Sequence, residues 1–156
     1  MGAVTARLAE LGLTLPSVAA PVAAYVPAVR SGKYVYTSGQ LPFVGGALLA
    51  TGKVGYGEGL VTPADAVRAA RTAALNALAA IAAVIGDLDQ VVRVVKVVGY
   101  VASDPSFTGQ PQVINGASEL LGEVFGPAGT HARSAVGVAV LPLDSPVELE
   151  LQVELS

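Results

Sequence analysis

The sequence has no cysteine, no tryptophan and one histidine among its 156 residues. The absence of cysteine excludes disulfide bonds, thiolate catalysis and a zinc site with cysteine ligands. A single histidine, His131, excludes a metal site built from several histidines.

Charge is also scarce, since charged residues make up 13% of the chain and hydrophobic residues 53%. This charged share is about half that of an ordinary soluble domain. Few charges and many apolar groups exclude intrinsic disorder, and the length suits one domain. Because a lone domain of this size cannot hide so much apolar surface, we expect a homo-oligomer with a large apolar interface.

The positive charges that exist are scattered. The net charge is −3, and the nine lysines and arginines form no run. Non-specific nucleic-acid binding depends on clustered positive charge, so we do not expect nucleic acid as a partner. Residues 1–10 lack the pattern of a secretory signal, and the longest uncharged apolar stretch, 72–86, has 15 residues. A membrane span needs about 20, so we expect a soluble, cytoplasmic protein with no membrane contact.

Hydrophobic periodicity and helix-end signals predict a single α+β domain. We expect helices over 3–11, 63–85 and 110–125, and strands over 25–29, 34–38, 91–102, 131–140 and 147–154. The valine-rich segment 91–102 is typical of a central strand buried on both faces. Six glycines within 44–59 predict a mobile loop or an irregular hairpin. The order of elements, with a hairpin at each end, predicts one sheet with two long helices on one face.

The segment 131–140 carries the most informative residue, Arg133. As a strand, its two faces alternate, and we expect the core face to consist of Ala132, Ser134, Val136, Val138 and Val140. The opposite face then consists of His131, Arg133, Ala135, Gly137 and Ala139. Arg133 would stand among small neighbours, where an arginine is costly unless it meets an anion.

Two interpretations of Arg133 stay open from the residues alone. In the first, its guanidinium pairs with a protein carboxylate, for instance Glu148 on a neighbouring strand. In the second, it binds the carboxylate of a small ligand through two parallel hydrogen bonds. If the last strand pairs with 132–140, Glu148 lies near Arg133, and the two together can bind an acid and position a water.

Other polar side chains are weaker candidates. Tyr25 and Ser38 are hydroxyls on the first two predicted strands, and Asn115 is a polar residue in the second long helix. His131 precedes Arg133 by two residues and can titrate near it, although a lone histidine at a strand start is commonly structural.

Three groups of residues resemble one known family. They are Tyr34-Val-Tyr-Thr-Ser-Gly-Gln-Leu-Pro42, Gly86-Asp-Leu-Asp89 before the valine strand, and Ala132-Arg-Ser134 followed by Leu141-Pro142 and Val147-Glu148. In this order and spacing they resemble the RidA/YjgF family, also called endoribonuclease L-PSP. The resemblance covers about residues 20–154, and the whole chain, 1–156, is expected to form one such domain. Residues 1–20 would form an N-terminal helix and connection, as in a branch with an extended N-terminus.

The resemblance implies a fold and an activity that composition does not. The fold would be chorismate-mutase-like, with a mixed sheet and two long helices on one face. Three chains would form a homotrimeric barrel with clefts between subunits. The activity would be hydrolysis of reactive 2-imino acids, such as 2-iminobutanoate and 2-iminopropanoate, to 2-oxo acids and ammonia. No cofactor and no metal are implied, and the partners would be small 2-imino and 2-oxo acids.

The resemblance also assigns roles to residues. Arg133 would hold the substrate carboxylate, and Glu148 would position or activate the attacking water. The other substrate-binding residues would be Tyr25, Ser38, Gly39, Asn115 and Ala135. Ala135 stands where the archetype has a cysteine, so only its main chain would serve. His131 stands where a proline is common.

Two other functions compete with the deaminase. A non-catalytic trimer could use Arg133 to bind a small carboxylate metabolite, or use its surface to bind a protein. An endoribonuclease or translation inhibitor is the function that the older family label suggests. The acidic balance and the lack of a basic patch argue against it.

Overall fold

The computed structural model describes residues 2–18 and 24–156. The helices are α1 (Ala3–Glu10), α2 (Pro63–Ile85) and α3 (Gln110–Phe125). The strands are β1 (Ala28–Ser31), β2 (Tyr34–Thr37), β3 (Phe43–Val44), β4 (Ala47–Leu48), β5 (Val91–Ala102), β6 (Ala132–Val138) and β7 (Val147–Leu155). Short 3₁₀ helices occupy Leu88–Gln90, Gly126–Gly129 and Pro142–Asp144. The predicted α+β class is confirmed.

Local signals explain where the long helices begin and end. Thr62 caps α2, because its Oγ1 accepts a hydrogen bond from the Asp65 backbone N–H at 3.2 Å, and Pro63 fills the first turn. Gly86 ends the helix with a φ of 83°, a conformation that favours glycine. Eight of the ten buried residues of α2 are alanines, so the helix can approach the sheet closely. The predicted bounds of α2 and α3 are confirmed.

The main sheet has five strands in the order β1-β2-β7-β5-β6. Only the β5–β6 pair is parallel, joined by α3 as a crossover helix; the other pairs are antiparallel. The last two strands therefore do not form the predicted terminal hairpin, because β7 returns between β2 and β5. Residues 131–140 and 147–154 are separated in space by β5.

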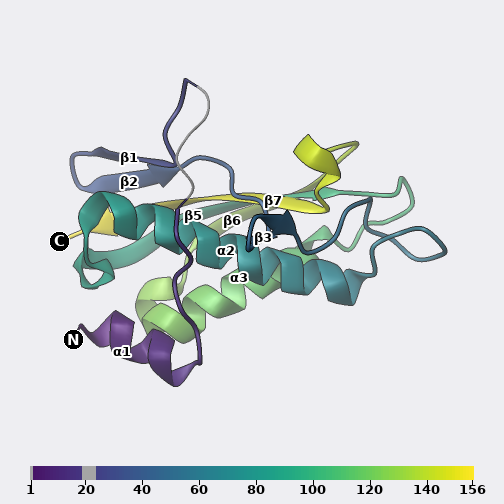
Figure 1. Cartoon of the computed structure of the whole chain (residues 1–156). Helices are drawn as coiled ribbons and strands as arrows, with labels where there is room; N and C mark the ends of the chain where they lie inside the picture. Colours follow the sequence, from purple (N-terminus) through teal and green to yellow (C-terminus); the bar gives the residue numbers. More distant parts are fainter. Residues whose placement is uncertain (1, 19–23) are drawn as a thin grey trace.

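The sheet has a covered face and an uncovered face. Figure 1 shows α2 and α3 together on one side of the sheet, where alternate residues of β7 such as Leu149 and Leu151 are fully buried. The other side has no helix layer within the described chain, and Tyr36 and Val136 there are 41% and 45% exposed. The prediction that 91–102 is buried on both faces is therefore wrong for the single chain, since Val92 is 47% exposed.

The predicted orientation of β6 is also wrong. Val136 and Val140, expected in the core, are 45% and 68% exposed, while Arg133 and Ala135 face α3. The reason is that α3 crosses close to β6. A Cβ added to Gly137 would lie only 2.7 Å from the Gln110 amide nitrogen, so small residues occupy the helix side and valines the open side.

The first hairpin begins three residues later than predicted. Pro27 has no N–H to donate to a strand ladder, so pairing begins at Ala28, which lies opposite Thr37. The hairpin turns at Gly32, whose φ is 59°. Tyr25 consequently lies before β1 rather than within a strand.

The glycine-rich segment forms the predicted irregular hairpin. β3 and β4 pair as two-residue strands and turn at Gly45 and Gly46, whose φ values are 59° and 85°. Further along, the Val54 N–H donates to the Ala102 carbonyl at 2.7 Å, which ties the segment to the end of β5.

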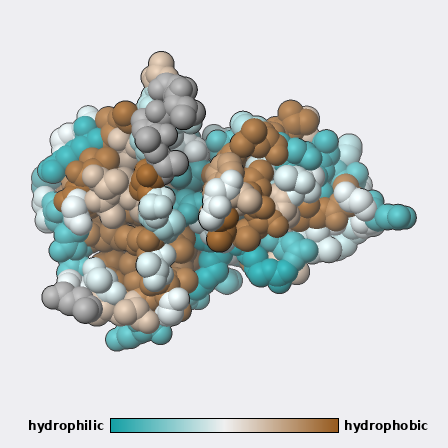
Figure 2. Space-filling model, in the orientation of Figure 1, coloured by the Kyte–Doolittle hydropathy of each residue, from teal (hydrophilic) through white to brown (hydrophobic). Residues whose placement is uncertain are grey.

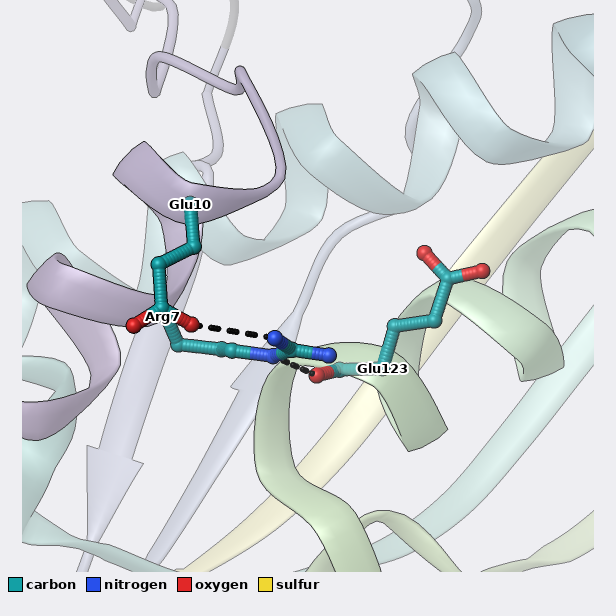
Figure 3. Close-up of polar contacts among 3 residues, drawn as sticks. All are labelled: Arg7, Glu10 and Glu123. Atoms are coloured by element: carbon teal, nitrogen blue, oxygen red, sulfur yellow. Dashed lines mark hydrogen bonds and ion pairs between the residues drawn. The ribbon is translucent and has the colours of Figure 1, made fainter.

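Helix α1 is held by side chains from distant parts of the chain. The Asp89 carboxylate accepts hydrogen bonds from the N–H groups of Ala3 and Val4, both at 2.7 Å, which satisfies donors at the start of the helix. Arg7 donates to the Glu123 carbonyl at 2.8 Å and pairs with Glu10 at 3.0 Å (Figure 3). The Asp89 contacts hold α1 to the 3₁₀ helix Leu88–Gln90, and the Arg7 contact holds it to the end of α3. The predicted helix over 3–11 is confirmed.

Helix α2, with 23 residues, is long and apolar enough to cross a membrane by length and composition alone. Half of the qualifying stretch is buried inside the protein, as in the core helix of a globular fold. Figure 2 shows hydrophobic residues reaching the molecular surface beside hydrophilic ones. Apolar surface thus remains outside the core, in keeping with the high apolar content.

Candidate functional site

Arg133 lies on the helix side of β6, at the edge of the sheet. Its Nη1 donates hydrogen bonds to Asn115 Oδ1 at 2.7 Å and to Ser118 Oγ at 3.2 Å, both on α3. Both partners are uncharged, and in the described part of the chain Arg133 forms no ion pair. The interpretation in which Glu148 neutralises Arg133 therefore does not hold within one chain.

His131 joins the same cluster through Ser118. Its Nε2 lies 2.9 Å from Ser118 Oγ, and its Nδ1 lies 2.6 Å from the Gly129 carbonyl oxygen. Asn115, Ser118, His131 and Arg133 thus form one connected hydrogen-bond network between α3 and β6. The histidine takes a structural place in this network, next to the arginine.

Glu148 lies on β7, on the uncovered face of the sheet. Burial raises the pKa of its carboxyl above the ordinary glutamate value, and repulsion from Glu150 raises it further. Gly39 lies directly against this carboxylate, since a Cβ added there would be 2.0 Å from Glu148 Oε1. The structure therefore brings together two of the predicted site residues, Glu148 and Gly39.

Tyr100 borders the same carboxylates from β5. It is the direct cross-strand neighbour of Glu148, and its hydroxyl donates to Glu150 Oε1 at 3.5 Å. Burial raises the pKa of the Tyr100 hydroxyl, and the charge of Glu150 adds to the effect. The uncovered face thus holds a small acidic cluster with one phenol.

Arg133 and Glu148 lie on opposite faces of the sheet. Arg133 aligns across the sheet with Val97, and Val97 aligns with the buried Leu151. Glu148 aligns instead with Tyr100, on the uncovered side. A single chain therefore does not bring the predicted pair into one site, contrary to the expectation that rested on direct pairing of the last two strands.

The remaining predicted residues occupy different surroundings. Ser38 Oγ donates to the Val26 carbonyl at 2.6 Å, so this hydroxyl fastens the segment before β1. Tyr25 is 59% exposed, and Ala135 packs against the core on the Arg133 side. Ser38 and Gly39 directly follow β2 and reach the Glu148 side, whereas Asn115 and Ala135 belong to the Arg133 side.

Sequence reasoning missed Ser118 and Tyr100. Ser118 follows Asn115 by three residues, so both lie on one face of α3, and that spacing could have found it. Tyr100 could not be found in this way, because its proximity to Glu148 depends on β7 pairing with β5.

Within residues 2–18 and 24–156, no three histidine, aspartate or glutamate side chains gather as metal ligands. A surface hollow beside α2, bordered by Leu49, Arg68 and Arg71, contains none of the predicted site residues. Arg68 pairs with Asp65, and Arg71 pairs with Glu123 at 2.7 Å, so both arginines there have partners.

Comparison with known proteins places the chain in a family. The family model described as "YjgF/chorismate mutase-like, putative endoribonuclease" matches residues 5–155. Protein TCP17 of Trypanosoma cruzi is 48% identical over 158 residues, covering 99% of this chain and 96% of that protein. The crystal structure of Atu1372 from Agrobacterium tumefaciens, a protein of unknown function, has 45% identity and a TM-score of 0.89, covering 99% of this chain and 93% of its own.

The crystal structure of a protein described as a "putative endoribonuclease" from Shewanella oneidensis has 36% identity and a TM-score of 0.92, covering 97% of this chain and 99% of its own. These matches confirm the resemblance that the Ser-Gly-Gln and Ala-Arg-Ser motifs indicated. The chain belongs to the YjgF/chorismate mutase-like family.

Proposed function

We propose that this protein is a cofactor-free hydrolase that converts reactive 2-imino acids to 2-oxo acids and ammonia. Arg133 holds the substrate carboxylate, and Glu148 positions the water. The observation that carries the proposal is the set of hydrogen-bond partners of Arg133. Its guanidinium is held by two neutral side chains and has no carboxylate partner among the described residues. An anion that fits the guanidinium fork is the natural complement.

The proposed chemistry needs little beyond orientation. Water adds to C2 of the protonated imine and Glu148 accepts one of its protons, which gives a carbinolamine. Glu148 returns that proton to the nitrogen, the C2–N bond breaks to release ammonia, and the hydroxyl on C2 loses its proton as it becomes the 2-oxo group. Holding carboxylate and water in place makes the attack effectively unimolecular. The raised pKa of Glu148 makes its carboxylate a better proton acceptor than an ordinary glutamate, which suits a group that takes a proton from water and gives it back.

The proposal places each site between two copies of the chain in a homotrimer. Arg133 and Glu148 lie on opposite faces of one sheet, so a site that uses both must draw them from different copies. The uncovered sheet face supports such an assembly, because Tyr34, Tyr36 and Val136 there are 40%, 41% and 45% exposed. Aromatic and aliphatic residues of this kind are typical of buried interfaces.

The endoribonuclease named in the family description is the competing function. Arg7, Arg68 and Arg71 pair with carboxylates of the chain itself. The other six lysines and arginines form no run in the sequence, which disfavours a phosphate backbone as the ligand. A non-catalytic carboxylate-binding protein would need Arg133 alone, so only an activity measurement separates it from the deaminase.

The decisive experiment is a competition for the imine. An amino-acid oxidase generates the 2-imino acid, semicarbazide traps it, and the protein competes by hydrolysing it. We expect the wild type to suppress trapping and Arg133→Ala to lose this effect. The matched control is Arg68→Ala, which removes the same charge from the exposed side of α2.

The outcomes distinguish the candidate functions. Calorimetry with 2-oxobutanoate, a product, should show binding to the wild type and to Arg68→Ala, and none to Arg133→Ala. Binding without suppression of trapping for any parent amino acid would support the non-catalytic carboxylate-binding protein. Unchanged binding to Arg133→Ala would refute the assignment of Arg133. Sedimentation of each variant at the mass of three 15.6 kDa chains tests the trimer and shows that assembly survives.

A further inference from the structure

We propose that Ser118 and His131 form a positioning relay that fixes Arg133 with one edge of its guanidinium open to a carboxylate. This inference rests on the proposed function and adds two residues to the same site. Ser118 and His131 act on the substrate only through Arg133, so both are positioning residues.

The donors and acceptors of the network fix its protons. The Gly129 carbonyl oxygen can only accept, so His131 Nδ1, 2.6 Å away, must carry the proton. In the neutral ring Nε2 is then an acceptor, and the Ser118 hydroxyl donates to it across 2.9 Å. With its proton used in this way, Ser118 Oγ offers a lone pair to Arg133 Nη1 at 3.2 Å. The series of hydrogen bonds therefore runs from Arg133 through Ser118 and His131 to the Gly129 carbonyl, and every donor in it meets an acceptor.

The same network determines which edge of Arg133 is free. Nη1 carries two hydrogens, and Asn115 Oδ1 and Ser118 Oγ take one each. Nε and Nη2 have no hydrogen-bond partner among the described residues. These two nitrogens present parallel N–H bonds on one edge, which is the edge that grips a carboxylate by two hydrogen bonds.

The relay restricts a side chain that would otherwise be mobile. A free arginine loses much of its rotamer entropy when a ligand immobilises it. Hydrogen bonds already present in the unliganded protein reduce that loss at the moment of binding. The effect of removing the relay should therefore appear in the affinity for carboxylates rather than in the chemical step.

The first test measures which ring nitrogen of His131 carries the proton. Because His131 is the single histidine of the chain, nitrogen NMR of protein with ¹⁵N-labelled histidine gives one pair of ring signals. In the neutral ring we expect a protonated Nδ1 and an unprotonated Nε2, and a shift of the Nε2 signal in Ser118→Ala. A ring protonated on Nε2 instead would overturn the relay. This measurement needs no substrate, so it stands apart from the proposed activity.

The second test measures what the relay does. In Ser118→Ala we expect about tenfold weaker binding of 2-oxobutanoate, or about 1.4 kcal/mol. The KM for imino acid should rise by a similar factor with kcat nearly unchanged. Ser118→Thr, which keeps the hydroxyl, should restore both values. Unchanged affinity and KM in Ser118→Ala would overturn the positioning role.

The two tests separate failure of the relay from failure of the proposed function. If His131 of the wild type has the Nδ1–H tautomer but the protein binds no 2-oxobutanoate, the proposed function is refuted while the hydrogen-bond network stands. Uniform loss of affinity for 2-oxobutanoate and for its uncharged amide in Ser118→Ala would mean damage to the pocket and would overturn the relay. Loss confined to the carboxylate form supports it.

Discussion

Gly39 offers a sharp test of Glu148, because the two are in direct contact. A Cβ added at Gly39 would lie 2.0 Å from Glu148 Oε1, 2.8 Å from Cδ and 3.1 Å from Cγ. Ordinary van der Waals contact begins at 3.4 Å, so the oxygen must retreat by about 1.4 Å in Gly39→Ala. The added Cβ meets Oε1, Cδ and Cγ of the glutamate at once, so the carboxylate leaves its present position.

We expect Gly39→Ala to lower the activity and to leave the stability of the fold nearly unchanged. Gly39 is exposed and its φ lies outside the left-handed region, so alanine can adopt the same backbone. Reduced freedom of the unfolded chain contributes about 0.4–1 kcal/mol of stability. Displacement of the half-buried Glu148 side chain offsets part of that gain, so we expect a net change within about 1 kcal/mol. A misplacement of about 1 Å at a reacting group can reduce the rate about 10²-fold, which is the loss we expect in kcat/KM.

The assay compares imine hydrolysis with urea unfolding for Gly39→Ala and for a matched glycine. Gly122→Ala lies on α3 with no atom within 4 Å of the added Cβ. It should keep full activity and gain up to about 1 kcal/mol of stability from helix propensity. If Gly39→Ala hydrolyses imines as fast as the wild type, Glu148 does not hold the water and the assignment fails.

Two further predictions concern charged groups. In Glu148→Gln we expect at least a 10²-fold loss of kcat, and the disappearance of the acidic limb of the wild-type pH–rate profile, which the raised pKa places above the ordinary glutamate range. Folding disfavours the ionised form of Glu148, so the stability of the wild type falls as the pH rises through the raised pKa. Denaturation at several pH values should therefore show Glu148→Gln becoming more stable relative to the wild type as the pH rises. A stability difference that stays constant with pH would contradict the raised pKa. In Asp89→Ala the Ala3 and Val4 N–H groups lose their acceptor, and urea unfolding should show a loss of about 0.5–2 kcal/mol, whereas an unchanged midpoint would mean that water replaces the cap.

Elements with local signals were predictable from the sequence. The cap at Thr62, the proline after it and the glycine at 86 fix both ends of α2 through interactions within a few residues. Apolar and polar residues alternate strictly over 147–154, and the burial of β7 alternates in the same way. In each case the information lies within the segment itself.

Features that depend on distant partners were not predictable. Which strand lies beside β7 is decided by the crossover through α3, and nothing within 131–140 or 147–154 encodes it. The face of β6 was misassigned for a related reason. Valines usually mark the core, but here the close approach of α3 reserves the helix side for Ala135, Gly137 and Arg133, whose guanidinium bonds to α3. The motif resemblance still points to Arg133 and Glu148 as candidate site residues, because matching of motifs does not depend on which strands pair.

The opposite placement of Arg133 and Glu148 makes subunit complementation a decisive experiment. Arg133→Ala and Glu148→Gln are each expected to be inactive as pure proteins. If every site takes its arginine from one copy and its glutamate from another, about a quarter of the sites in a random equal mixture keep both residues. Co-refolding the two variants should then restore about a quarter of wild-type activity, while refolding either alone restores none. If the mixture stays inactive although mixed oligomers form, the two residues do not work together across an interface, and the uncovered sheet face must serve another purpose.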